Sequence, residues 1–304
     1  MQGIELSRAY FEVCAPALQA EFPDLWPRVA AGVCGQGSEN FGFDDEVSRD
    51  HDFDPGFFIW LSPEDYKAYE FRLSRAYDRL PREYLGVAIS GQSVYGSARH
   101  GVRETQAFFR ELTGFYPAPE TNMQWLRTEQ HRLACAVNGE IFFDGGGDVT
   151  AARQALTAMP EDVRLKKLAK HVALAAQAGQ YNYSRALAHG QKGSAALSLS
   201  RFAEEYTKAA FLMNRRYAPF YKWLLPAGAK LPVLGEEISR LTRLVTDPLK
   251  ETAAAEIESL AAAMIGELTR AGLTDHPAAF LEPHAYEIMN RIADPQLRML
   301  HVMD

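Results

Sequence analysis

The order of apolar and polar residues predicts that the first half of this chain alternates helices with short strands. Leu6, Tyr10, Cys14 and Leu18 recur at helical spacing, so an amphipathic helix is expected over residues 4–21. Short apolar runs bounded by glycine, proline or charged residues predict buried strands. The predicted strands lie at about residues 29–34, 53–61, 85–89, 100–105 and 139–143. The predicted helices between them lie at about residues 63–80, 106–113 and 123–137.

After the glycines at 145–147 the pattern becomes helical, and no further strand is expected. Alanine- and leucine-rich segments follow one another from about Thr150, separated by residues such as Pro160, Gly190 and Pro248. A chain of 304 residues forms one large domain or two ordinary ones. We therefore predict an α+β fold class, with a small mixed β-sheet domain over residues 1–150 followed by an all-α helical domain over residues 151–304.

Composition and charge narrow the class of protein. The 32 basic and 39 acidic residues give a net charge of −7, which makes a nucleic-acid partner unlikely because such binding needs a basic face. The N-terminal segment lacks the basic and apolar regions of a signal peptide, and no apolar run has the length of about 18 residues that a membrane span requires. The three cysteines have no zinc-site spacing. A cytoplasmic protein without a membrane partner is expected.

One stretch carries candidate chemistry. Six of the eleven residues from Asp44 to Asp54 are acidic, and only Arg49 opposes them. Carboxylates at this density repel one another unless something neutralises them, and a divalent cation is one such neutraliser. On an extended strand, Asp50 and Asp52 point to the same face, about 6.6 Å apart along the chain. Such a pair can hold Mg²⁺, which prefers oxygen ligands and keeps substrate phosphates in its shell.

Upstream of this pair, Gly37 and Ser38 follow a predicted strand. A glycine at this position lets backbone N–H groups approach a phosphate, and the serine hydroxyl can add a hydrogen bond. A metal site beside a phosphate cradle is typical of phosphoryl or nucleotidyl transfer. The alternative interpretations are a solvated acidic turn for Asp50 and Asp52, and a plain strand-ending turn for Gly37-Ser38.

Other motifs are excluded by their spacing. The run Asp50-x-Asp52-x-Asp54 resembles the start of a calcium loop, but Pro55 stands where glycine is needed and Leu61 where a glutamate is needed. The glycines at 32, 35 and 37 do not form a dinucleotide-binding fingerprint, and no P-loop sequence is present.

The order Gly37-Ser38, a gap of about a dozen residues and then Asp50-x-Asp52 resembles the signature of DNA polymerase beta-like nucleotidyltransferases, which include kanamycin and lincosamide nucleotidyltransferases. The fuller sequence over residues 37–52 is similar to a bacterial branch of that superfamily described as a domain of unknown function. Three further segments are similar to the same branch, and they extend the resemblance over most of the chain. These segments are residues 93–96, 139–144 and 215–223.

The resemblance implies a small mixed sheet followed by a helical domain that closes over a nucleotide. It implies that Asp50 and Asp52 ligate Mg²⁺ and that Gly37 and Ser38 hold the triphosphate of a nucleoside triphosphate such as ATP. Members of the superfamily commonly have a third acid on a later strand; Asp144 is the first candidate here and Glu140 the second. For Asp144 the alternative is a turn residue before the glycines at 145–147.

Lys222 lies in the helical half, where it can reach nucleotide phosphates; helix packing and solvent exposure are the alternative. The leading hypothesis is therefore an Mg²⁺-dependent enzyme that transfers a nucleoside monophosphate from a nucleoside triphosphate to a hydroxyl or amine of a small molecule or protein. The second hypothesis is a catalytically degenerate protein of the same fold that binds a nucleotide or a partner. A third is a helical interaction protein whose first half is only a scaffold.

Overall fold

The computed structural model describes residues 2–45, 55–89 and 100–304, and the chain in it forms two compact units. The first unit comprises Met1–Pro119 and Arg132–Ala158, and the second comprises Glu120–His131 and Met159–Asp304. The predicted α+β fold class is confirmed, since a small mixed sheet lies in the first unit and the second is helical throughout its described residues. None of the helices described has both the length and the apolar character of a membrane span.

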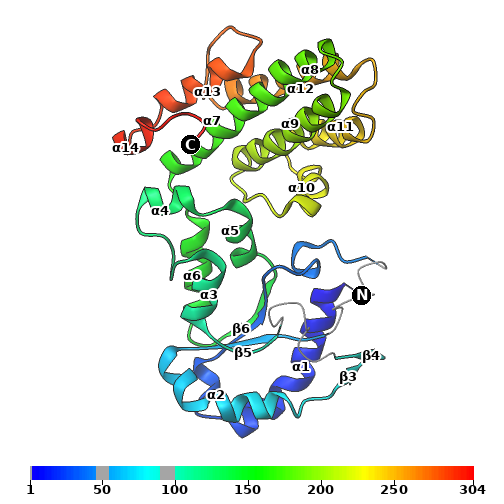
Figure 1. Ribbon diagram of the computed structural model, residues 1–304. Helices are drawn as coiled ribbons and strands as arrows, with labels where there is room; N and C mark the ends of the chain where they lie inside the picture. The colour runs from blue at the N-terminus through cyan, green and yellow to red at the C-terminus, as the bar shows by residue number, and fades with distance from the viewer. Residues whose placement is uncertain (1, 46–54, 90–99) are drawn as a thin grey trace. The chain divides into compact units, whose positions relative to one another are not determined.

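A four-stranded sheet is the centre of the first unit. Its strands are β1 (Ala30–Val33), β2 (Phe58–Leu61), β5 (Gly101–Glu104) and β6 (Glu140–Asp144), in the order β5-β2-β1-β6. Figure 1 labels the two outer strands, β5 and β6. β1 runs antiparallel to both of its neighbours, whereas β2 and β5 are parallel. The predicted strand over residues 85–89 is instead part of a separate hairpin of β3 (Glu83–Tyr84) and β4 (Val87–Ala88).

Both faces of this sheet are covered by helices. The alternating residues Ala31 and Val33 of β1 and Ile59 and Leu61 of β2 belong to one buried cluster. Apolar residues of α1 (Gly3–Glu21) and α2 (Pro63–Tyr77) complete that cluster. On the other face, the ring of Trp60 lies 5.3 Å from that of Phe108 on α3 (Thr105–Thr113).

Local sequence signals fix the ends of these helices. The backbone N–H of Gln2 donates to Glu5 Oε2 at 3.1 Å before the first turn of α1. At the start of α2, Ser62 Oγ accepts a hydrogen bond from the N–H of Asp65 at 3.1 Å, and Pro63 occupies the first helical position.

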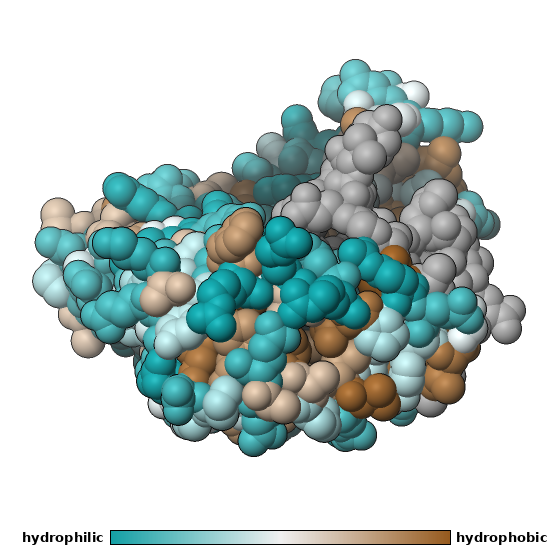
Figure 2. All heavy atoms as spheres, turned by 90° about the horizontal axis from the view of Figure 1, so that it is seen from below, coloured by the Kyte–Doolittle hydropathy of each residue, from teal (hydrophilic) through white to brown (hydrophobic). Residues whose placement is uncertain are grey.

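Seen from below, the surface is covered mostly by hydrophilic residues with apolar atoms between them (Figure 2).

The second unit is built on two long helices, α7 (Glu161–Ala175) and α9 (Lys192–Met213), which pack against each other. A π-helical segment, Ala176–Tyr183, continues α7. It passes so close to α9 that a Cβ atom on Gly179 would lie 2.4 Å from the ring of Phe202, which explains the glycine at this position. The remaining helices are α8 (Ser184–Ala188), α10 (Tyr221–Gly228), α11 (Gly235–Thr246), α12 (Ala253–Arg270), α13 (Leu281–Asn290) and α14 (Pro295–Arg298).

The helix predicted over residues 123–137 is two helices, α4 (Asn122–Arg127) and α5 (Gln130–Val137). Thr128 ends the first of them, because its backbone is extended (φ −78°, ψ 121°) while its hydroxyl donates to the carbonyl of Gln124 at 2.9 Å. The break places Gln130 at the start of α5, and its side chain takes part in a buried polar network described below.

Candidate functional site

The loop that follows β1 is held by a reciprocal amide clamp. The N–H of Gly35 donates to Asn138 Oδ1 at 2.9 Å, and Asn138 Nδ2 donates to the carbonyl of Gly35 at 2.8 Å. Gly35 has a φ of +123°, a backbone conformation that favours glycine. The N–H of Gly139 also donates to the carbonyl of Asn40 at 3.1 Å. The loop is therefore fixed from both sides by the segment that leads into β6.

Gly37 and Ser38 lie in this loop, just before a turn of 3₁₀-helix, Glu39–Phe41. The carbonyl of Ser38 accepts hydrogen bonds from the N–H groups of Phe41 and Phe43, at 3.1 and 3.0 Å. Between described residues, the N–H groups of Gly37 and Ser38 themselves donate no hydrogen bond. Ser38 is half-buried, and its side chain makes no capping bond to this turn. Backbone N–H groups of this kind can donate hydrogen bonds to a phosphate oxygen.

The strand register determines which segments meet at the end of the sheet where β1 finishes and β2 begins. Gly32 near the end of β1 pairs with Phe58 at the start of β2, so the loop after β1 and the entry to β2 share one edge. Asp50 and Asp52 precede β2 in the sequence but lie outside the described residues. Their predicted position on one face of a strand, and their contact with a metal, stay predictions.

The register places Asp144 at the other end of the sheet. Asp144 pairs with Ala30, the first residue of β1, whereas Glu140 pairs with Val33, the last. Four residues of strand separate the two acids by about 13 Å along β6. The two carboxylate oxygens of Asp144 accept hydrogen bonds from the N–H groups of Gly147 and Thr150, at 2.9 and 2.7 Å.

Asp144 therefore holds the start of α6 (Asp148–Thr157) and is not brought together with Gly37 and Ser38. This position fits the alternative interpretation of Asp144 as a turn residue, and its role as the third acid stays a prediction. Glu140, the second candidate, lies at the same edge as the loop after β1, where it forms an ion pair with Arg8 of α1. Its side chain is 36% exposed, so the carboxylate remains accessible to solvent.

Other charged groups also lie near this loop. A Cβ atom on Gly37 would meet the carboxylate of Glu39, which shows that this carboxylate folds back over the glycine. Asp44 Oδ2 accepts a hydrogen bond from the N–H of Gly3 at 2.5 Å, at the positive end of the α1 dipole. No group of three or more His, Cys, Asp or Glu side chains suited to a metal lies together within residues 2–45, 55–89 and 100–304.

Cys34, a buried thiol just after β1, interacts electrostatically with the half-buried Arg153 of α6. Burial raises the pKa of Cys34 to about 12, against the opposing charge of Arg153, so the thiol stays protonated at neutral pH. Arg153 Nη2 donates to the carbonyl of Val137 at 2.7 Å, while Nη1 is buried and has no partner among the described residues. Cys34 is thus not a nucleophile, whereas Arg153 contributes positive charge.

The first unit contains a cavity of about 480 Å³ that the motif analysis missed. Its wall includes His100, which precedes β5 and stacks on Tyr77 with ring centroids 6.1 Å apart. A Cβ atom on Gly56 would lie 2.7 Å from His100 Cδ2, so this histidine packs against the segment that enters β2. The lining is aromatic and charged, with Tyr66, Glu70, Arg82 and Arg103 among its side chains. These residues are scattered over the sequence, and no local motif marks them.

Lys222 belongs to the second unit. It lies at the start of α10, exposed to solvent, with its Nζ 4.1 Å from the ring centroid of Trp223. This cation–π contact accounts for its position without a ligand.

The chain is similar to one protein family and to a solved structure. The sequence profile of a family described as "Domain of unknown function (DUF4037)" matches residues 125–224, a range that contains Lys222 but not Gly37, Ser38, Asp50 or Asp52. The crystal structure of a nucleotidyltransferase-like protein from Exiguobacterium sibiricum 255-15 is similar over 94% of this chain and 81% of that chain, at 13% sequence identity and a TM-score of 0.38. No protein of curated function matches.

Proposed function

We propose that this protein is an Mg²⁺-dependent nucleotidyltransferase, which moves a nucleoside monophosphate from a nucleoside triphosphate, such as ATP, to a hydroxyl or amine. The observation that carries the proposal is the loop after β1, where the N–H groups of Gly37 and Ser38 are held without a partner among the described residues. A triphosphate oxygen is the ligand that such donors would bind.

The chain connectivity supports a role for the acidic pair. The segment that carries Asp50 and Asp52 continues into Pro55 and β2, and β2 starts beside this loop. Asp52 is three residues from Pro55, and three residues of chain span at most about 11 Å. A carboxylate pair tethered this closely can share a ligand with Gly37 and Ser38.

The residues described at this edge fit a divalent cation. Glu39 and Glu140 supply carboxylate oxygens, which Mg²⁺ prefers, and their segments are joined by the hydrogen bond from Gly139 to Asn40. In the proposal, Asp50 and Asp52 would hold the ion, which when bound neutralises charge on the phosphate oxygens. The protein's own part is to orient the triphosphate through Gly37 and Ser38.

Glu140 takes the place of Asp144 in this proposal. A carboxylate at the edge shared with the triphosphate can accept the proton of the acceptor hydroxyl or amine, as a general base does. Arg8 of α1 is the ion-pair partner of this carboxylate. Arg153, whose charge acts on Cys34 just after β1, adds positive charge to this unit.

The cavity lined by His100, Tyr77 and Arg103 is the proposed acceptor site. It lies in the same unit as the loop, and one of its lining residues, His100, packs against Gly56 in the segment between Asp52 and β2. Its volume of about 480 Å³ suits a small molecule or one side chain of a protein.

The test is the release of pyrophosphate from nucleoside triphosphates with Mg²⁺ and a panel of acceptors. The variants Asp50→Asn and Asp52→Asn should each lower turnover at least about 100-fold, without loss of thermal stability. Glu12→Gln, on the exposed face of α1, makes the same charge change and should leave turnover unaltered. Full turnover in both aspartate variants would eliminate the proposal.

A catalytically degenerate protein is the second candidate function, and the position of Asp144 at the opposite end of β1 from the glycine-serine loop favours it. Calorimetry separates the two candidates. Binding of ATP without release of pyrophosphate across the acceptor panel would indicate the degenerate form.

A further inference from the structure

The second unit contains a cavity of its own, of about 490 Å³. It is formed where α4 and the first turn of α5 meet α7, α9 and the Ala218-Pro219 segment. Its volume lies in the range of small-molecule sites. None of the residues proposed for nucleotidyl transfer in the first unit lines it.

Basic side chains dominate the charge of this cavity. Four cations line it against two carboxylates: Arg127, Lys167, Lys170 and Lys208 against Glu129 and Asp304. Glu129 and Asp304 are exposed, whereas Lys167 is only 7% exposed. The positive charge is therefore deepest in the cavity and the negative charge lies nearer to solvent.

Lys167 is rigidly held with its charge facing this space. Its Nζ donates to the carbonyls of Leu126 and Thr128, both at 2.8 Å, which leaves one of its three N–H donors without an acceptor among the described residues. Burial lowers the pKa of Lys167 to about 8, partly offset by Glu129 and reinforced by the charge of Lys170. A bound anion would stabilise the ammonium form.

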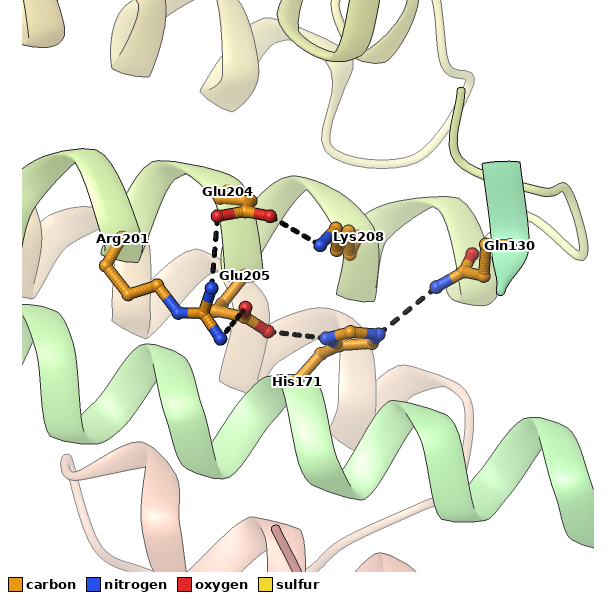
Figure 3. A network of polar contacts seen from close by, with 6 residues as sticks. All are labelled: Gln130, His171, Arg201, Glu204, Glu205 and Lys208. Carbon is orange, nitrogen blue, oxygen red and sulfur yellow. Dashed lines mark hydrogen bonds and ion pairs between the residues drawn. The ribbon is translucent and has the colours of Figure 1, made fainter. Parts of the chain in front are cut away.

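A buried network shapes the floor of the cavity (Figure 3). Gln130 Oε1 accepts a hydrogen bond from the N–H of Ala218 at 3.2 Å, so its Nε2 is the donor to His171 Nε2 at 3.1 Å. His171 must then carry its proton on Nδ1, from which it donates to Glu205 Oε2 at 2.5 Å. Arg201 completes the network with an ion pair to Glu205 at 2.8 Å.

Within this network, the negative charge of Glu205 is balanced by partners inside the protein. Burial alone would raise the pKa of Glu205, but its hydrogen bond from His171 and the charges of Arg201 and Lys208 outweigh burial and lower it. Glu205 is thus ionised, and its two oxygens are engaged by His171 and Arg201. Lys208 is paired with Glu204 at 2.5 Å but remains part of the lining.

An apolar wall faces these cations. Met123, Leu126, Ala218, Pro219 and Leu300 line the same cavity. A ligand that fills it must therefore combine an apolar or aromatic body with a charged anionic group. A free inorganic ion would leave the apolar wall without a partner.

We propose that this cavity binds a small phosphomonoester, with its phosphoryl group against Lys167, Lys170 and Lys208 and its apolar or aromatic body against Leu126 and Pro219. Phosphate accepts charge-assisted hydrogen bonds from several ammonium donors at once, which fits the three lysines that line this cavity. The proposal does not depend on the nucleotidyltransferase function, because the site needs neither Gly37-Ser38 nor a metal.

Isothermal titration of the full chain with phenyl phosphate, in the presence of EDTA, tests this proposal. Phenyl phosphate should bind in one site, phenol should not bind, and inorganic phosphate should bind more weakly than phenyl phosphate. Lys170→Ala and Lys208→Ala should each weaken binding about tenfold or more. Lys192→Ala removes the same charge at the opposite end of α9, about 24 Å from Lys208, and should leave the affinity unchanged.

Each other outcome has a definite meaning. Equal binding of phenyl phosphate to the wild type and to both lysine variants, or no binding at all, would overturn the proposal. A loss of binding in Asp50→Asn would assign the phosphate to the first unit instead, and would also overturn it. Far-ultraviolet circular dichroism of the lysine variants establishes that they are folded, which is expected because neither lysine is fully buried.

Discussion

Glu140 lies directly across from Val33, the last residue of β1, and this pairing decides which acid of β6 is near the glycine-serine loop. Asp144, four residues later, pairs with the first residue of β1 and binds two backbone N–H groups. The two acids therefore have separable roles, one at the edge of the proposed site and one in holding a helix.

The first prediction compares Glu140→Gln with Asp144→Asn. Glu140→Gln should reduce Mg²⁺-dependent turnover at least about 100-fold but change the free energy of unfolding by less than about 1 kcal/mol, because its ion pair with Arg8 is exposed. Asp144→Asn should lower the free energy of unfolding by about 1 kcal/mol and leave turnover nearly intact. Pyrophosphate release and urea denaturation measure the two effects. The opposite pattern would return the third-acid role to Asp144.

The second prediction concerns the amide clamp between Asn138 and Gly35. Asn138→Ala removes two hydrogen bonds, so the free energy of unfolding should fall by about 1–3 kcal/mol and nucleotide affinity should fall several-fold as the loop loosens. Asn214 is a matched control, since in the second unit it makes a similar clamp with Val233. Asn214→Ala should cost similar stability without loss of nucleotide affinity. Equal affinity losses in both variants would indicate a general effect of destabilisation.

Much of the fold follows from the sequence because its signals are local. The apolar run before Cys34 predicts β1, and Pro63 with the acids that follow it predicts the start of α2, as the structure confirms. The break at Thr128 was missed because apolar residues keep helical spacing across it, and only the bonds to Gln124 reveal it.

The site was less predictable, because register and long-range contacts decide it. A register shift between Ala31 and Gly32 helps to set which residue of β6 lies beside the loop, and no local pattern encodes that shift. Gly32 permits it, since a Cβ atom there would lie 2.3 Å from the carbonyl oxygen of Glu140. Likewise, Gln130, His171 and Glu205 meet only through helix packing.

The third prediction is a loss of stability on acidification that depends on His171. Burial lowers the pKa of His171, against the bond and charge of Glu205 and with added effects of Lys208 and Lys167. Below pH 6.5, the unfolded chain, with a histidine pKa of about 6.5, therefore binds a proton at this residue that the folded chain does not bind. The free energy of unfolding should fall as the pH falls below about 6.5, by up to about 1.4 kcal/mol per pH unit.

Urea denaturation between pH 5 and pH 7 measures this slope. His171→Gln removes the titrating group, while the glutamine amide can still donate a hydrogen bond to Glu205, and the substitution should flatten the slope in that window. His189→Gln, at an exposed histidine after α8, should keep the wild-type slope. An unchanged slope in His171→Gln would show that another group governs acid stability.

The last prediction tests how tightly the segment before Glu140 is packed against β1. Gly139 has a φ of +62°, and a Cβ atom there would lie 2.1 Å from the carbonyl oxygen of Val33. Gly147 has a similar φ of +79°, but a Cβ atom there would meet no atom within 4 Å. Both alanine variants carry the cost of the left-handed backbone, about 1 kcal/mol, but only Gly139→Ala must also displace the strand. Thermal unfolding should therefore show a clearly larger loss for Gly139→Ala than for Gly147→Ala. Since the displaced strand carries Glu140, Gly139→Ala should also lose turnover at temperatures where it is still folded, whereas Gly147→Ala should keep it; equal stability and equal turnover in the two variants would show that the edge beside Val33 is loosely packed.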